Sequence, residues 1–164
     1  MAARSRWTPA VPKARASCLR CLAPTDTLYG MQECTDMLLV EDDPADVFMY
    51  RKALEPHLEG TIHCEPRAAG VSAALGAIQP AFVVTDLNLP GADGTSVIQT
   101  VRRGDGHRAL PVIVCSTSAD PADVERAYAA GANAYVRKPA NLDGWSELAR
   151  CLTCFWGDMN LRPV

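Results

Sequence analysis

Short apolar segments alternate with helical segments five times between Met37 and about Phe155, and this alternation limits the chain to few folds. The apolar segments predict strands at residues 37–40, 61–64, 81–85, 111–115 and 134–137. Repeated strand–helix units indicate a parallel sheet with helices on both faces, and right-handed connections leave few topologies. We therefore expect an α/β fold of flavodoxin-like type, a doubly wound, five-stranded parallel (βα)5 sheet with strand order 2-1-3-4-5.

Capping residues mark where the helices begin and end. Asp43 followed by Pro44 is a helix start, with an N-cap residue and then proline at the first helical position. Asp120 begins another helix in the same way, and Gly131 ends it. The predicted helices span residues 44 to near 56, 68–78, 95–103, 121–130, and from 142 or 143 to about 155.

The first 36 residues lack this regular pattern. They are rich in Ala, Arg, Pro, Ser and Thr, with no acidic residue before Asp26. An organelle transit peptide, a flexible tail or a translation start at Met31 or Met37 would each explain them, and we favour the last two. We expect an extension over residues 1–36, one domain over 37–156 and a C-terminal tail over 157–164.

Charge and hydropathy exclude some classes of protein. The net charge of −3 argues against nonspecific nucleic-acid binding, and the apolar runs are too short to span a bilayer. We expect a cytoplasmic protein with no nucleic-acid partner and no membrane partner. Seven cysteines and no secretory signal argue against a disulfide framework. The CxxC pairs Cys18/Cys21 and Cys151/Cys154 could form a split zinc site or occur by chance, and we favour chance because four ligands must converge.

Polar residues follow four of the predicted strands at the point where each strand ends. These residues are Glu41, Asp42 and Asp43 after the first strand, Asp86 after the third, Ser116 and Thr117 after the fourth, and Lys138 after the fifth. The carboxyl ends of parallel strands share one edge, where such sheets form their sites. Carboxylates gathered there repel one another and favour a cation, and oxygen ligands suit Mg²⁺. Asp86 could then act as a nucleophile and form an acyl phosphate, with Lys138 and the cation stabilising the phosphoryl anion.

The chain resembles the receiver domain of bacterial response regulators over about residues 37–155. The resemblance lies in LLVEDDPADV (38–47), VVTDLNLPGADG (83–94), PVIVCSTSAD (111–120) and GANAYVRKP (131–139). It implies that Asp86 accepts a phosphoryl group in the presence of Mg²⁺. Glu41 and Asp42 match the metal-binding acidic pair, with Asp42 favoured as the direct ligand, and Asn88 would add its backbone carbonyl.

The same resemblance implies a switch. Lys138 would contact a phosphoryl oxygen, Ser116 would move toward the phosphoryl group, and Tyr135 would turn inward in response. Pro139 matches a turn that often holds a cis peptide. A receiver of this kind catalyses only its own phosphorylation and dephosphorylation, so we do not expect an enzyme acting on a separate substrate.

Shorter motifs resemble the single-domain regulators that partner bacterial phytochromes: EDDPADV, STSAD, and FW followed by LRPV. This similarity implies a stand-alone receiver that takes phosphate from a sensor histidine kinase, a phytochrome among the candidates, and signals to a downstream protein. Phe155 and Trp156 could form a homodimer contact or close the core. A pseudo-receiver that binds without phosphorylation, or a phosphate sink or relay, remains the alternative. Three acids after the first strand argue against a flavodoxin. Gly91 argues against a haloacid-dehalogenase motif, DxDGT, whose tail Asp93-Gly94-Thr95 resembles.

Overall fold

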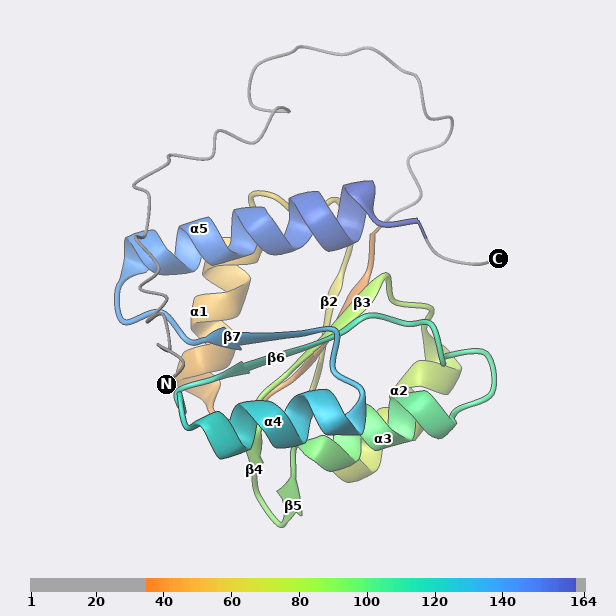
Figure 1. Cartoon of the computed structure of the whole chain (residues 1–164). Coiled ribbons are helices and arrows are strands. Elements are labelled where there is room, and N and C mark those ends of the chain that lie inside the picture. The colour runs from red at the N-terminus through yellow and green to blue at the C-terminus, as the bar shows by residue number, and fades with distance from the viewer. Residues whose placement is uncertain (1–34, 162–164) are drawn as a thin grey trace, which may run out of the picture. The chain divides into compact units, whose positions relative to one another are not determined.

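The computed structural model describes residues 35–161, in which five parallel strands form one sheet (Figure 1). The order β2-β1-β3-β6-β7 confirms the predicted order 2-1-3-4-5, because β4 and β5 form a separate hairpin. The strands of the sheet are β1 (Met37–Val40), β2 (Ile62–Glu65), β3 (Phe82–Thr85), β6 (Val112–Ser116) and β7 (Ala134–Arg137). Within these residues no helix is both long and apolar enough to cross a membrane.

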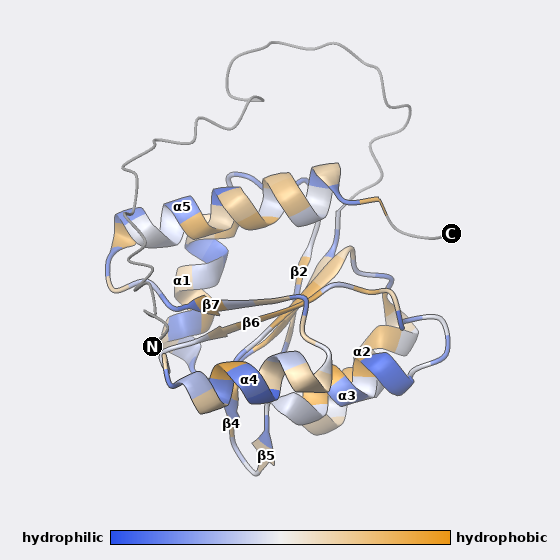
Figure 2. Ribbon diagram, in the orientation of Figure 1, coloured by the Kyte–Doolittle hydropathy of each residue, from blue (hydrophilic) through white to orange (hydrophobic). Residues whose placement is uncertain are grey.

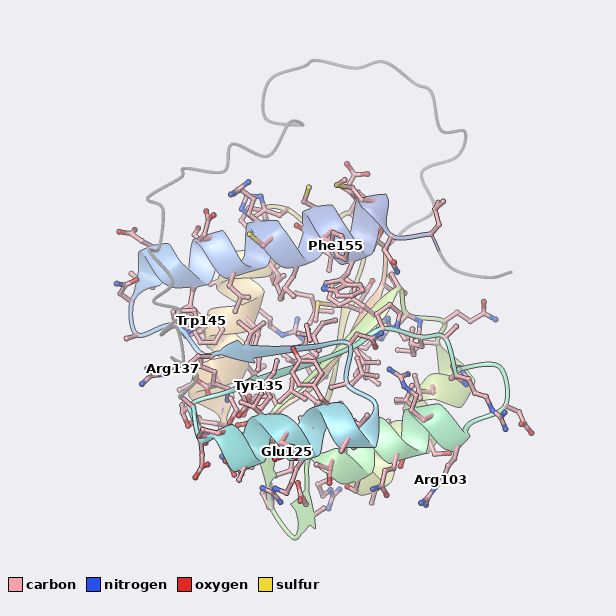
Figure 3. All side chains as sticks on the ribbon, viewed as in Figure 1. Arg103, Glu125, Tyr135, Arg137, Trp145 and Phe155 are labelled. Atoms are coloured by element: carbon pink, nitrogen blue, oxygen red, sulfur yellow. The ribbon has the colours of Figure 1, made fainter. Side chains whose placement is uncertain are left out.

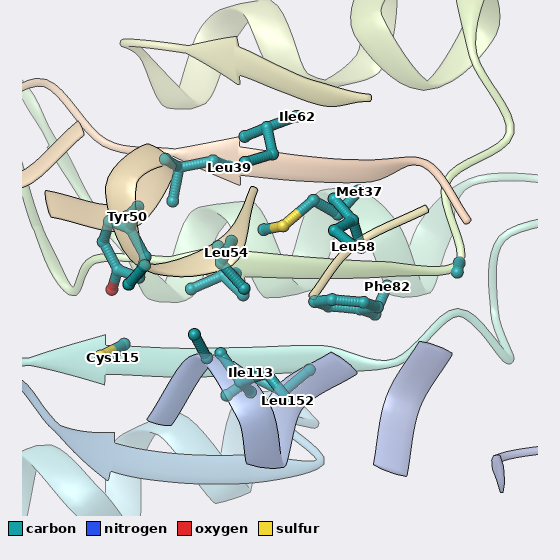
Figure 4. Packing of buried hydrophobic residues seen from close by; sticks show 14 of the residues in the cluster. Met37, Leu39, Tyr50, Leu54, Leu58, Ile62, Phe82, Ile113, Cys115 and Leu152 are labelled. Atoms are coloured by element: carbon teal, nitrogen blue, oxygen red, sulfur yellow. The ribbon is translucent and has the colours of Figure 1, made fainter. Parts of the chain in front are cut away.

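Helices cover both faces of the sheet. On one face lie α1 (Pro44–Leu54) and α5 (Leu142–Leu152), and on the other lie α2 (Val71–Ala77), α3 (Thr95–Arg103) and α4 (Pro121–Ala130) (Figure 1). The side chains of β1 pack alternately against the helices on the two faces, since successive residues of a strand point to opposite faces. Met37 and Leu39 join the cluster under α1 and α5 (Figure 4), whereas Leu38 and Val40 join the cluster under α2, α3 and α4. All four residues of β1 are fully buried.

Hydropathy follows this layered arrangement (Figure 2). The central strands β1, β3 and β6 consist of buried residues, as expected for parallel strands covered on both sides. The rings of Tyr50 and Trp145 join α1 to α5 in an edge-to-face contact, with centroids 4.8 Å apart. Such an aromatic pair stabilises a fold by about 0.5–1.5 kcal/mol in addition to the free energy gained by burying the apolar area of the rings.

The register of the strands aligns their carboxyl ends. Val40 pairs with Thr85 of β3, and Thr85 pairs with Val114 of β6. The ladder continues one step past the strands, because the Asp86 amide donates to the Val40 carbonyl at 3.0 Å. On the other side the Lys138 amide donates to the Ser116 carbonyl at 2.8 Å. Backbone pairing therefore fixes the residues that follow β1, β3, β6 and β7 at one edge.

The expected caps are present, and some expected boundaries were wrong. Asp43 and Asp120 each accept a hydrogen bond from the second residue of their helix, and Gly131 ends α4 with φ of +104°. The second helix is shorter than expected, because residues 68–70 form a 3₁₀ turn. The last helix is longer than expected: α5 passes into a π-helical segment, η3, that reaches Met159.

Two local features around the site differ from expectation. The loop after β3 contains a hairpin of β4 (Asn88–Leu89) and β5 (Ala92–Asp93), with Gly91 at its turn in the left-handed region, φ +72°. Glycine is the residue that this backbone conformation favours. The peptide bond between Lys138 and Pro139 is trans, although the resemblance implies a turn that often holds a cis peptide.

Candidate functional site

Asp86 is held by its own backbone neighbours. The residue is buried at the end of β3, and its Oδ1 accepts hydrogen bonds from the amides of Leu87, at 2.5 Å, and Asn88, at 3.2 Å. The Thr85 hydroxyl donates to the Asp86 carbonyl at 2.9 Å. With Oδ1 occupied by two amides, the carboxylate presents Oδ2 to the rest of the site.

The ammonium of Lys138 lies at the centre of the site. Its Nζ donates three hydrogen bonds, each 2.7 Å long, to carboxylate oxygens of Glu41, Asp46 and Asp86. The Lys138 side chain is 5% exposed and that of Glu41 is 1% exposed. We call these four residues the Lys138 cluster. Three carboxylates against one ammonium give the cluster a formal charge of −2, which leaves it short of positive charge.

The pKa values of the cluster show the cost of burying charge. Burial raises the pKa of Glu41, and the contact with Lys138 only partly offsets this. Burial by itself would lower the pKa of Lys138, but its hydrogen bonds to the three carboxylates raise that pKa well above the ordinary value. Lys138 is therefore charged at neutral pH. A further cation near Glu41 would favour the ionised form of its carboxylate.

A cavity of about 490 Å³ opens beside the cluster, and Asp42 lies in its wall. The other residues that line it come from the hairpin region and α4: Leu87, Asn88, Leu89, Pro90, Ala92, Asp93 and Arg126. Asp42 and Asn88 both line this cavity, and the Asn88 amide donates to Asp86 Oδ1.

The donor set suits a divalent cation, although its members are engaged elsewhere in this structure. Carboxylates of Glu41, Asp42 and Asp86 supply the oxygen ligands that Mg²⁺ prefers. Within residues 35–161 no three His, Cys, Asp or Glu side chains are already arranged around a common point for an ion. Glu41 and Asp86 contact the Lys138 ammonium instead. A metal ion would therefore have to share these carboxylates with Lys138.

The zinc hypothesis gains no support. Cys18 and Cys21 lie outside the described residues. Cys151 belongs to α5 and Cys154 to η3, where the Cys154 Sγ lies 3.9 Å from the Met159 Sδ.

Ser116 and Tyr135 meet at a third residue that sequence reasoning missed. Ser116 is fully buried, and its Oγ accepts a long hydrogen bond, 3.4 Å, from the Ser118 amide. The Tyr135 hydroxyl donates to the Ser118 carbonyl at 3.1 Å, with the ring between β7 and α4 (Figure 3). The Ser118 hydroxyl donates to Asp123 of α4 at 2.6 Å. Ser118 therefore links both expected switch residues to α4.

A second charged cluster joins the hairpin to α4. Arg126 contacts Asp93 of β5 at 2.8 Å and Asp123 of its own helix at 2.6 Å. We call these three residues the Arg126 cluster. The Arg126 side chain is 53% exposed and that of Asp93 is 44% exposed, whereas the Lys138 side chain is 5% exposed. Arg126 and Asp93 line the cavity, and their ion pair joins the loop after Asp86 to the helix after Ser116.

Asp46 is the second residue that sequence reasoning missed. It stands in the first turn of α1, three residues after the Asp43 cap, and its Oδ2 reaches Lys138. The sequence EDDPAD could have predicted this contact. A capped helix directly after the acidic pair turns its first-turn side chains back toward the end of the strand. Acidic residues are common in first helical turns because they stabilise the helix N-terminus. Asp46 could be explained in that way, so the sequence alone did not point to a contact with Lys138.

The family model of the response regulator receiver domain matches residues 37–149. The chain belongs to the response regulator receiver family. This places it in two-component signalling and confirms the resemblance on which the expected site rests. It also removes the flavodoxin and haloacid-dehalogenase alternatives.

Curated relatives include regulators of several kinds. FilR2 of Methanothrix harundinacea, a probable methanogenesis regulatory protein, is 32% identical over 136 residues, which are 77% of this chain and 86% of FilR2. The response regulator Rcp1 of Synechocystis is 31% identical over 86 residues, 52% of this chain and 58% of Rcp1. The transcriptional regulator KdpE of Escherichia coli is 34% identical over 105 residues, and the chain spans 45% of its length.

Solved structures show the same fold. The phosphorylated cyanobacterial phytochrome response regulator RcpA has a TM-score of 0.73 and 27% identity, with 79% of this chain and 99% of RcpA covered. The Mn²⁺-bound form of Rcp1 has a TM-score of 0.70 and 25% identity, with the same coverage. The Mg²⁺-bound receiver domain of the kinase PA1611 from Pseudomonas aeruginosa has a TM-score of 0.65, 25% identity and coverage of 76% and 98%.

Proposed function

We propose that this receiver domain accepts a phosphoryl group on Asp86 from a phosphohistidine of a sensor histidine kinase. The observation that carries the proposal is the buried Asp86 carboxylate, whose Oδ1 is fixed by two amides and whose Oδ2 lies 2.7 Å from the Lys138 ammonium beside an open cavity. A carboxylate held in this way is oriented for attack before a donor arrives, and such orientation removes part of the entropic barrier.

In the proposed reaction, Asp86 Oδ2 attacks the phosphorus of the donor. A phosphorus–oxygen bond forms as the phosphorus–nitrogen bond of phosphohistidine breaks, and the imidazole leaves with the electron pair and takes a proton from water. Lys138 then turns from Asp86 Oδ2 to a phosphoryl oxygen and stabilises its negative charge. Glu41, Asp42, Asp86 and the Asn88 carbonyl would hold Mg²⁺, which neutralises charge on the carboxylates and the phosphoryl group when bound.

We propose that the output leaves the site through Ser116, Ser118 and Tyr135. A phosphoryl oxygen offers the Ser116 hydroxyl a charge-assisted hydrogen bond that is stronger than a neutral one. Movement of Ser116 would disturb the Ser118 segment, which also holds the Tyr135 hydroxyl and the first turn of α4. The surface formed by α4, β7 and α5 would thereby change shape and present itself to a downstream protein.

The phytochrome-linked relatives favour a bacterial phytochrome as the partner kinase and a homodimer through the end of the last helix. Phe155 in η3 is 50% exposed (Figure 3), while Trp156 packs against the core with its ring 4.7 Å from that of Phe155. Trp156 therefore fits the expected role of closing the core. Phe155 fits the expected role of a contact with a second copy of the chain. A phosphate sink or relay, or a pseudo-receiver, would use the same fold.

Intact-protein mass measurement tests the assignment. Wild type incubated with acetyl phosphate and Mg²⁺ should gain the mass of one phosphoryl group, and Asp86→Asn should not. Asp105→Asn, which removes a carboxylate from an exposed loop, is the matched control and should be labelled like wild type. Equal labelling of Asp86→Asn would show that another residue accepts the group, and no labelling of wild type would favour the pseudo-receiver.

We also propose that residues 1–30 are dispensable for folding and for phosphorylation. A chain that starts at Met31 should keep the thermal midpoint and the labelling rate of the full chain. A fall in the midpoint of about 4–8 °C, equivalent to roughly 1 kcal/mol in a small domain, would show that the extension contributes to stability.

A further inference from the structure

Asp46 makes the one contact in the Lys138 cluster that the proposed phosphorylation does not consume. Phosphorylation converts Asp86 Oδ2 into an acyl phosphate oxygen, and a bound cation would be held in part by Glu41. Asp46 enters neither step, and its Oδ2 lies 2.7 Å from Lys138 Nζ. We infer that Asp46 is a positioning residue that keeps the Lys138 ammonium at the site while its other two partners are engaged in the reaction.

Helix α1 gives Asp46 a fixed position from which to do this. The Asp43 side chain caps the helix through the Ala45 amide at 2.8 Å, Pro44 fixes the first helical position, and the Val47 amide donates to the Asp43 carbonyl at 2.9 Å. The first turn is therefore closed on both sides of Asp46. The Asp46 side chain is 27% exposed, so it reaches the buried ammonium from the rim of the site.

Lysine is the kind of residue that needs such a partner. Its ammonium is a point charge on a flexible stem of four carbons, with three rotatable donors. In this structure each of the three donors has one carboxylate acceptor. Once Asp86 and Glu41 turn to the phosphoryl group and the cation, Asp46 alone limits the positions that the ammonium can adopt. A misplacement of about 1 Å at a reacting group can cost up to about a hundredfold in rate.

The inference rests on the proposed function, and kinetics of phosphorylation can test the two separately. Initial rates are measured with acetyl phosphate in saturating Mg²⁺ for wild type, Asp46→Ala and Asp46→Asn. We expect the rate of Asp46→Ala to fall about tenfold, and that of Asp46→Asn to fall less, because the amide keeps an oxygen acceptor for the ammonium. Glu55→Gln removes a charge from the other end of α1 and should match wild type.

A double-mutant cycle shows whether Asp46 acts through Lys138. In a Lys138→Met background, whose slower labelling is followed over hours by mass, Asp46→Ala should cause no further loss of rate, since the group that it positions is absent. The Mg²⁺ dissociation constant, measured by calorimetry, should not rise in Asp46→Asn. Thermal midpoints of Asp46→Ala and Asp46→Asn within about 4 °C of wild type would exclude a general loss of structure in these two variants.

Three results would overturn the inference. Losses that multiply in the double variant would show that Asp46 acts independently of Lys138. Weaker Mg²⁺ binding by Asp46→Asn would make Asp46 part of the metal site, and faster phosphorylation would make it a competitor for the ammonium. Failure of wild type to accept phosphate would instead reject the function proposed for Asp86, which is a separate outcome.

Discussion

The Lys138 cluster and the Arg126 cluster each gather carboxylates around one cation. They differ in burial: 5% of the Lys138 side chain is exposed against 53% of the Arg126 side chain. A charge removed from water loses hydration that only good partners can replace. An exposed ion pair replaces contacts with water by contacts within the protein, at little net gain in free energy. Similar contacts should therefore have very different energetic weight, and only the buried cluster should resist disruption.

The largest effect is expected when the cation of the buried cluster is removed. Lys138→Met leaves three buried or half-buried carboxylates facing one another, so the free energy of unfolding at neutral pH should fall by about 3 kcal/mol. Urea unfolding measures this change, and added Mg²⁺ should recover part of it by replacing the lost positive charge. A loss below about 1 kcal/mol would show that water enters the cluster and screens it as it screens Arg126.

Alkaline pH should narrow the gap between wild type and Lys138→Met. Pairing in the cluster raises the pKa of Lys138 above its unfolded value of about 10.4. The stabilisation that the ammonium provides is complete below that pH and is lost as the pH rises through the folded pKa. Cys115 also titrates in the alkaline range, because burial raises its pKa to about 11 while the Lys138 charge opposes that shift. A gap that stays constant in urea unfolding at increasing pH would contradict the expected narrowing.

The coupling between the two sides of the cavity should be smaller. Ser116→Ala should still take phosphate at Asp86 but transmit it poorly, since the alanine cannot bond the phosphoryl oxygen. Amide exchange with and without beryllofluoride, a phosphoryl mimic, measures the response over residues 116–159, and a coupling of about 1–3 kcal/mol is typical of such links. If wild type and variant respond equally, the signal crosses to α4 by another route, for which the Arg126 cluster is the first candidate.

The smallest effect is expected at the exposed cluster. Arg126→Met makes the same chemical change as Lys138→Met, but water can solvate Asp93 and Asp123 as the arginine leaves. The thermal midpoint should move by no more than about 2 °C, and about 0.5 M salt should remove the difference, because screening acts on exposed charges. A shift as large as that of Lys138→Met would mean that burial does not distinguish the two clusters.

The comparison also explains which parts of the molecule the sequence predicts. Residues that end strands, such as Asp86 and Lys138, are positioned by the sheet ladder, so alternation and strand order are enough to predict their proximity. Asp46 is positioned by the rotation of α1 about its axis, which depends on packing and not on a local motif. Ser118 acts through three different atoms in a loop, and no periodic pattern reports where a loop carbonyl points.

The misjudged boundaries have similar local causes. The two-residue strands of the hairpin are too short to show alternation, and the turn residues Pro90, Gly91 and Gly94 indicate a loop but no strands. At the other end of the chain, the Thr153 hydroxyl donates to the Ala149 carbonyl at 3.0 Å, where α5 widens into η3. A side chain that competes for the backbone carbonyl one turn earlier is known to distort helices, and threonine alone does not reveal when it will do so.

The hydrogen bond from the Asp86 amide to the Val40 carbonyl has a consequence for how this chain can change over evolutionary time. Because that bond belongs to the sheet ladder, the register of β1 against β3 fixes the position of Asp86 relative to the acids after β1. This register can shift only by whole residues. A deletion or insertion of one residue inside β1 or β3 would turn every following side chain to the opposite face and carry Asp86 away from Lys138. The loops at the far edge of the sheet carry no such constraint, so length variation among related chains should gather there and stop at the strands.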